Sequence, residues 1–198
     1  LLSGVEGRAH HLIEAAPELH AAAAEVFGFI DAGFLTVGIL AEDNLDRVAA
    51  CGRAIDALAA ALAQGVDLVK PSLRELRDLT GLPLLTRAEQ LAAARGLVTR
   101  GQARRVALSL GDQGALLVTA GTAHFAPALP VPVASTIGAG DSFLAGLLWA
   151  LDRGDGPDTA LRYGMAAGAA ALLSAGSALS QATDVQRLFH EACARPAD

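Results

Sequence analysis

The feature that most constrains the fold is the regular alternation of short apolar runs with helix-forming segments after residue 65. Val66–Val69 and Arg105–Leu110 have the length and composition of buried strands. Segments long enough to form helices lie between these two runs and after the second one. This order is typical of α/β layer proteins. We therefore expect a doubly wound α/β fold, with helices on both faces of a mostly parallel sheet.

Capping signals place the helices between these runs. Ser72 is followed three residues later by Glu75, and Thr86 by Glu89, which is the spacing of a capping box. Each pair predicts the start of a helix. Further helices are expected at 142–151, at 159–173 and from 184 onward.

Composition narrows the classes of function. Apolar residues make up 53% of the 198 residues but aromatic residues only 4%, so Ala, Leu and Val must build the core. The net charge of −6 argues against general nucleic-acid binding. The longest apolar stretch, Val26–Ala41, contains Asp31 and falls short of the ~20 residues of a spanning helix. We expect a cytoplasmic protein without a membrane or nucleic-acid partner.

The segment Gly138–Asp141 carries the strongest chemical signal. Glycines let the backbone turn sharply at a helix start, where N–H groups and the helix dipole bind anions. An aspartate beside a bound phosphate suits phosphoryl transfer, because its carboxylate accepts the proton of the attacking hydroxyl. The alternative is that Asp141 is simply the N-cap of the helix. These four residues alone leave both interpretations open.

Four segments together resemble the ribokinase-like, or PfkB, family of carbohydrate kinases. They are Val69–Leu76, Ser109–Ala115, Ser135–Gly146 and Tyr163–Ala170. Their order and spacing match the family, and the likeness covers about residues 50 to 192. We expect an unassigned segment at 1–49 and a PfkB-type ATP-binding and catalytic region at 50–198.

The resemblance implies roles for individual residues. Asp141 would be the base that deprotonates a sugar hydroxyl, and Gly138, Ala139 and Gly140 would form the anion hole. ATP with Mg²⁺ is the implied cofactor pair, and K⁺ is an implied monovalent cation. Residues implied to contact the nucleotide, its phosphates or Mg²⁺ are Lys70, Ser72, Glu75, Ser109, Gly111, Gly114, Thr136, Met165, Gly168 and Ala169. Backbone oxygens implied to hold the monovalent cation belong to Ser135, Ile137, Ala171 and Gly176. For Lys70 and Glu75 the alternative is a solvated lysine and a capping glutamate.

One position marks a branch of the family, and another departs from the family pattern. Many sugar kinases have Asp at the position of Ser135, and a serine there resembles the branch that phosphorylates sugar phosphates, with fructose 6-phosphate as the expected acceptor and fructose 1,6-bisphosphate as the product. Ser72 stands where the family usually has Asn.

The substrate-binding aspartate and lid of the family's N-terminal half are not recognisable in residues 1–49. We therefore expect a member truncated on its N-terminal side, with impaired turnover and an exposed sheet edge that favours a homo-oligomer. The alternatives are a non-catalytic fragment that binds nucleotide only, and a kinase for another sugar or a nucleoside.

Overall fold

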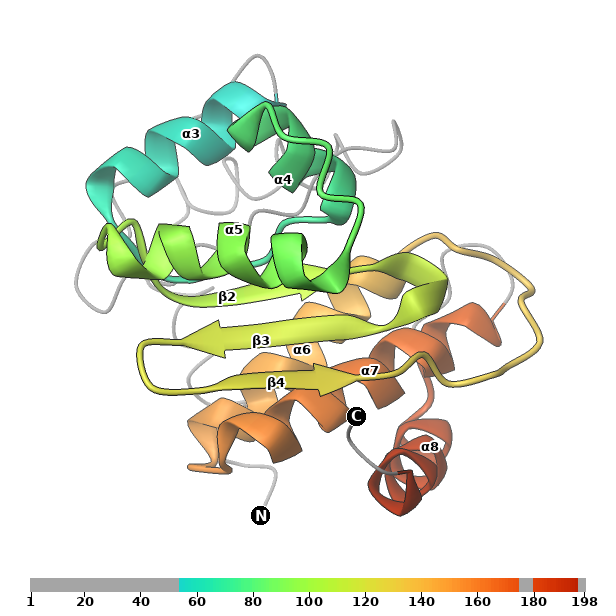
Figure 1. Cartoon of the computed structure of the whole chain (residues 1–198). Coiled ribbons are helices and arrows are strands. Elements are labelled where there is room, and N and C mark those ends of the chain that lie inside the picture. Colours follow the sequence, from blue (N-terminus) through green and yellow to red (C-terminus); the bar gives the residue numbers. More distant parts are fainter. Residues whose placement is uncertain (1–53, 175–179, 196–198) are drawn as a thin grey trace, which may run out of the picture.

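The computed structural model describes residues 54–174 and 180–195 (Figure 1). The predicted segment 1–49 lies outside these residues. The helices are α3 (Ala54–Gln64), α4 (Leu73–Thr80), α5 (Arg87–Thr99), α6 (Ala139–Asp152), α7 (Pro157–Leu172) and α8 (Ala182–Ala194). The strands are β1 (Val66–Val69), β2 (Ala103–Ser109), β3 (Ala115–Thr119) and β4 (Ala123–Ala126).

The four strands form one sheet in the order β1-β2-β3-β4. The pairing of β1 with β2 is parallel, whereas β2 with β3 and β3 with β4 are antiparallel. The prediction of a mostly parallel sheet is therefore wrong for the described strands, which form a mixed sheet. Short turns such as Gly111–Gln113 require the antiparallel pairings, because a connection of a few residues can join only antiparallel neighbours.

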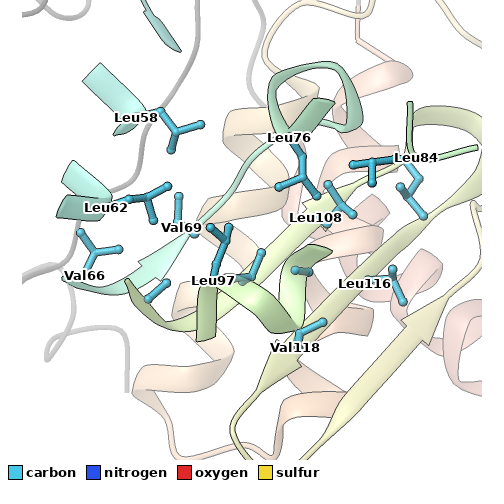
Figure 2. Close-up of a cluster of buried hydrophobic side chains, with 14 of the residues drawn as sticks. Leu58, Leu62, Val66, Val69, Leu76, Leu84, Leu97, Leu108, Leu116 and Val118 are labelled. Carbon is cyan, nitrogen blue, oxygen red and sulfur yellow. The ribbon is translucent and has the colours of Figure 1, made fainter. Parts of the chain in front are cut away.

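Helices cover both faces of the sheet, as expected for an α/β layer fold. Figure 1 shows α3, α4 and α5 on one face and α6, α7 and α8 on the other. Leucine and valine side chains fill the core between the sheet and the first helix layer, as Figure 2 shows for Leu76, Leu97 and Leu108. A second core on the opposite face includes Leu147 and Leu161. The first core agrees with the expectation of few aromatic residues, whereas the second also buries Phe143 and Tyr163.

Both predicted capping boxes are present. The Ser72 side chain accepts a hydrogen bond from the backbone N–H of Glu75, and Thr86 does the same for Glu89. Helix α4 ends at Gly81 in the left-handed conformation. Local sequence thus sets where these helices begin. None of the described helices is long and apolar enough to cross a membrane.

Helices α6 and α7 pack closely through glycines. A Cβ on Gly146 would lie 2.7 Å from the Cβ of Ala167, and one on Gly164 would lie 3.0 Å from the carbonyl oxygen of Phe143. Only glycine allows the two helix backbones to approach this closely. This contact fixes α6, and with it the segment that carries the predicted base.

Candidate active site

Two chain segments meet at the carboxyl edge of the parallel strand pair. The Ser109 backbone N–H, at the end of β2, donates to the carbonyl of Pro71 at 3.0 Å, just after β1. Ser72 and Ser109 also form an isolated parallel bridge. Open α/β sheets bind ligands at this edge. The predicted nucleotide residues Lys70, Ser72 and Ser109 therefore lie close together.

The N-terminus of α6 reaches the same place and has no side-chain cap. Its N-cap is Gly138, in the left-handed conformation with φ 77°, and this N-cap makes no side-chain hydrogen bond. Asp141 lies in the first turn of the helix, so the alternative that Asp141 is the N-cap is wrong. Helix α6 also begins at Ala139, earlier than the predicted residue 142. An uncapped helix start of this kind offers N–H donors to an anion.

The turn before α6 is held by its own hydrogen bonds. The Ser135 hydroxyl oxygen accepts from the N–H of Ile137 at 3.2 Å. The carbonyl of Thr136 accepts from the N–H of Ala139 at 3.4 Å. These contacts shape the approach to the helix start, while the side chains of Thr136 and Ile137 are exposed.

Lys70 brings a positive charge to this helix start. Its side chain is only 7% exposed, so the alternative of a solvated lysine is wrong. Its Nζ lies 3.3 Å from where a Cβ on Gly140 would be. Burial lowers the pKa of Lys70, while the charges of Glu75 and Asp141 raise it and offset part of that shift. The ammonium is thus placed between the starts of α4 and α6.

Glu75 does act as a capping glutamate. Its Oε2 accepts from the N–H of Ser72 at 2.7 Å, and its own N–H donates to the Ser72 hydroxyl oxygen at 3.3 Å. A carboxylate can accept more than one hydrogen bond or bind a cation with its other oxygen. The capping role of Glu75 is therefore compatible with the prediction that its carboxylate also reaches Mg²⁺.

The turn between β2 and β3 requires glycine at two predicted positions. Gly111 has φ 63° and Gly114 has φ 114°, both unfavourable for other residues. A Cβ on Gly114 would lie 2.1 Å from the carbonyl oxygen of Ala126. The turn is exposed from Gly111 to Gln113, beside the end of β2. Its place at the carboxyl edge agrees with the predicted nucleotide contacts.

The residues predicted to flank adenine have packing roles in the described structure. Met165 and Ala169 lie in apolar cores, with 9% and 6% of their surface exposed. Gly168 packs against α6, where an added Cβ would lie 3.2 Å from the carbonyl oxygen of Ala139. Their contact with adenine stays a prediction.

The residues predicted to hold a monovalent cation are partly brought together. The carbonyl of Leu172, next to Ala171, accepts hydrogen bonds from the N–H groups of Ala134 and Ser135. The end of α7 therefore lies beside the turn that precedes α6. Gly176 lies outside the described residues. Among the described residues, no group of three or more His, Cys, Asp and Glu side chains could hold a metal ion.

The approach of the Lys70 ammonium to Gly140 is the part of the site that sequence patterns did not predict. Both residues were predicted to belong to the site, but for separate reasons. They are far apart in the chain, and no spacing rule links them. Only the meeting of β1 with the start of α6 brings them together.

Comparison with protein families identifies the class of protein. The model of the pfkB family carbohydrate kinases matches residues 39–184. The chain belongs to this family. The match begins within the segment that the sequence patterns left unassigned.

Individual relatives are phosphofructokinases. The chain is 42% identical over 190 residues to the ATP-dependent 6-phosphofructokinase isozyme 2 of Mycobacterium tuberculosis, covering 91% of this chain and 56% of that one. The fold is similar to Escherichia coli phosphofructokinase-2 in complex with substrates and products, with a TM-score of 0.68 and 37% identity, over 70% of this chain and 45% of that one. The structure of the same enzyme in complex with potassium gives a TM-score of 0.67, with the same identity and coverage. The chain spans about half the length of these relatives.

Proposed function

We propose that this chain carries the nucleotide-binding and catalytic part of an ATP-dependent kinase that phosphorylates a hydroxyl of a sugar phosphate, with fructose 6-phosphate as the acceptor and fructose 1,6-bisphosphate as the product. The observation that carries the proposal is the uncapped start of α6. It combines backbone N–H donors, the Asp141 carboxylate and the buried Lys70 ammonium. The similarity to phosphofructokinases supports the choice of substrate.

Each part of the arrangement has a task in phosphoryl transfer. The acceptor hydroxyl gives its proton to Asp141 as its oxygen bonds to the γ-phosphorus of ATP. The bond between that phosphorus and the bridging oxygen of ADP breaks at the same time. Backbone N–H groups at Gly138, Ala139 and Gly140, together with the Lys70 ammonium, stabilise the negative charge on the transferring group.

The described residues also fit the implied metal ions. Proteins bind Mg²⁺ through one or two carboxylates together with the phosphates of the nucleotide. Glu75 supplies such a carboxylate near Lys70, and Ser72 a hydroxyl next to it. When bound, Mg²⁺ neutralises phosphate charge. The turn at 135–137 and the end of α7 would supply backbone oxygens to K⁺.

Release of ADP from Mg-ATP in the presence of fructose 6-phosphate tests the proposal. Asp141→Asn should lower turnover by about a thousandfold, because a general base contributes roughly 10²–10⁴. Binding of a non-hydrolysable ATP analogue should persist. Asp152→Asn is a matched control, since Asp152 is an exposed carboxylate at the other end of α6. Equal turnover in wild type and Asp141→Asn would remove Asp141 as the base.

A panel of acceptors separates the remaining alternatives. Fructose 6-phosphate should be preferred over free sugars and nucleosides, and replacing K⁺ with a bulky organic cation should lower turnover. A preference for an unphosphorylated sugar or a nucleoside would assign a different kinase of this family. Nucleotide binding without turnover on any acceptor would favour the non-catalytic alternative.

A further inference from the structure

The loop between α4 and α5 exposes two leucine side chains close together in the chain. Leu85 is 74% exposed and Leu82 is 53% exposed. Among the described residues, the other large apolar side chains with comparable exposure are Val133 and Ile137, on a different segment. Exposed apolar side chains that gather at one place mark sites of contact with another protein. The two leucines therefore point to a docking surface at the start of α5.

Buried contacts hold this loop in the conformation that exposes the leucines. Leu84 has φ 43°, the one positive φ among the described non-glycine residues, and is 2% exposed. Its carbonyl oxygen accepts hydrogen bonds from Nε2 of the buried Gln90 at 3.2 Å and from Nη2 of Arg77 at 3.4 Å. A leucine rarely adopts this left-handed conformation without such support. The loop is thus preformed, and a preformed surface loses less entropy on binding.

Two adjoining grooves along α5 can receive apolar side chains. Their volumes are about 510 and 660 Å³, and both are lined by Ala92, Gly96 and Arg100. The small side chains of Ala92 and Gly96 let another helix approach α5 closely. Protruding leucines and an apolar groove therefore lie on the same surface of one chain. A second copy of the chain supplies the matching half of each contact.

The exposed face of α5 is self-complementary when two copies run antiparallel. Leu85, Ala92 and Thr99 repeat every seven residues on this face, and all three are exposed. Glu89 and Arg95 lie three residues on either side of Ala92. A two-fold axis at Ala92 therefore places Glu89 of each copy opposite Arg95 of the other, and Leu85 opposite Thr99. Parallel pairing in register would instead bring like charges together.

We propose that α5 and the loop before it form the interface of a homodimer, in which two copies pack antiparallel about a two-fold axis at Ala92. Leu82 and Leu85 of each copy are buried against α5 of the other. Helix α5 covers the face of the sheet opposite to α6 (Figure 1), so this interface leaves the start of α6 open. The inference does not rest on the proposed function, and the interface differs from the sheet edge expected from the sequence.

Sedimentation equilibrium of the full 198-residue chain, from about 1 to about 200 µM, tests the interface. Wild type should show an equilibrium between monomer and dimer. Leu85→Glu should raise the dissociation constant of the dimer by at least about a hundredfold, because the symmetry places the new charge in two apolar contacts. Val133→Glu is the matched control, since Val133 is 61% exposed but lies before α6. Its dissociation constant should stay within about twofold of wild type.

A cysteine at position 92 tests the position of the axis. In a background with Cys51→Ser and Cys193→Ser, Ala92→Cys should give a disulfide-linked dimer on oxidation with diamide, because position 92 of one copy faces position 92 of the other. Ala145→Cys, at an exposed position of α6, is the control and should stay monomeric on a non-reducing gel.

Charge reversal tests the antiparallel direction. Arg95→Glu should weaken the dimer roughly tenfold, because it faces Glu89 of the other copy. Adding Glu89→Lys in the same chain should restore most of the affinity, although it removes a capping interaction of α5. Failure of this rescue, with both variants folded by circular dichroism, would overturn the antiparallel arrangement.

The remaining outcomes separate this dimer from other occupants of the surface. A chain that is monomeric at every concentration overturns the proposal. If Leu85→Glu then also lowers Tm, the surface contacts residues 1–53 of the same chain instead. A dimer that survives Leu85→Glu and does not cross-link through position 92 also overturns the proposal and favours the sheet edge. A dimer of the expected kind without kinase turnover would keep this inference and count against the proposed function.

Discussion

Helices α4 and α6 both start beside Lys70, but their N-termini are built differently. Helix α4 is closed by its own side chains, because Ser72 and Glu75 satisfy each other's backbone N–H groups. Helix α6 starts at Gly138 without a side-chain cap and carries Asp141 in its first turn. A closed start stabilises its own helix, whereas an open start keeps donors for a ligand. The difference supports α6 as the helix start that binds phosphate in the proposed function.

The largest expected difference in turnover is between variants of Asp141, at the start of α6, and Glu75, at the start of α4. Asp141→Asn removes the proposed base, whereas Glu75→Gln keeps an oxygen that can still accept the N–H of Ser72. Turnover with Mg-ATP and fructose 6-phosphate should fall about a thousandfold for the first variant and about tenfold for the second. Equal losses would contradict the distinction between the two helix starts.

The glycine at the open start can be tested by comparison with another glycine N-cap. Gly138 has φ 77°, whereas Gly156, the N-cap of α7, has φ −65°. Gly138→Ala should lower the free energy of unfolding by about 1–2 kcal/mol, the usual cost of a left-handed non-glycine residue. Gly156→Ala should cost only about 0.5 kcal/mol, because alanine is a poorer N-cap than glycine but the backbone there is not left-handed. Urea denaturation of both variants measures the difference, and similar values would contradict it.

The closed start can be tested with the second capping box as its control. Ser72→Ala and Thr86→Ala each remove one hydroxyl cap and should each cost about 1 kcal/mol of stability. Only Ser72 lies beside the end of β2, next to the proposed phosphate site. The Ser72 variant alone should therefore weaken binding of Mg-ATP. If Thr86→Ala weakened binding as much, the effect would come from stability alone.

The smallest expected effect is on how the stability of the protein depends on pH. Burial lowers the pKa of folded Lys70 below its ordinary value of 10.5, so the unfolded chain binds this proton more tightly. The resulting penalty is present below the folded-state pKa and disappears as pH rises toward 10.5. Lys70→Met should thus be more stable than wild type at neutral pH by on the order of 1 kcal/mol.

That advantage should shrink as the pH rises toward the ordinary lysine value. Thermal unfolding of both proteins from about pH 7 to about pH 10 provides the check. Arg100→Met is the control, because Arg100 is an exposed cation whose removal involves no buried charge. Its stability difference from wild type should stay constant over this range. An advantage of Lys70→Met that does not change with pH would contradict the cost assigned to the buried ammonium.

Local signals account for much of the fold. The capping boxes at Ser72 and Thr86 act within four residues, so their spacing located both helix starts correctly. The alternation of apolar runs and helices indicated the α/β class. The expectation of a mostly parallel sheet was wrong for the described strands, because β3 and β4 follow short connections and pair antiparallel.

The residues of the candidate site could be predicted from short stretches of sequence. The turn at Gly138–Asp141 and its resemblance to the family are recognisable without knowing which residues lie beside it in the fold. How those members meet depends on the packing of the whole domain. Lys70 lies close to Gly140 because β1 ends where α6 begins, and the glycine-mediated packing of α6 against α7 holds that helix in place. Burial of the Lys70 charge likewise depends on every element around it, and no local pattern encodes that.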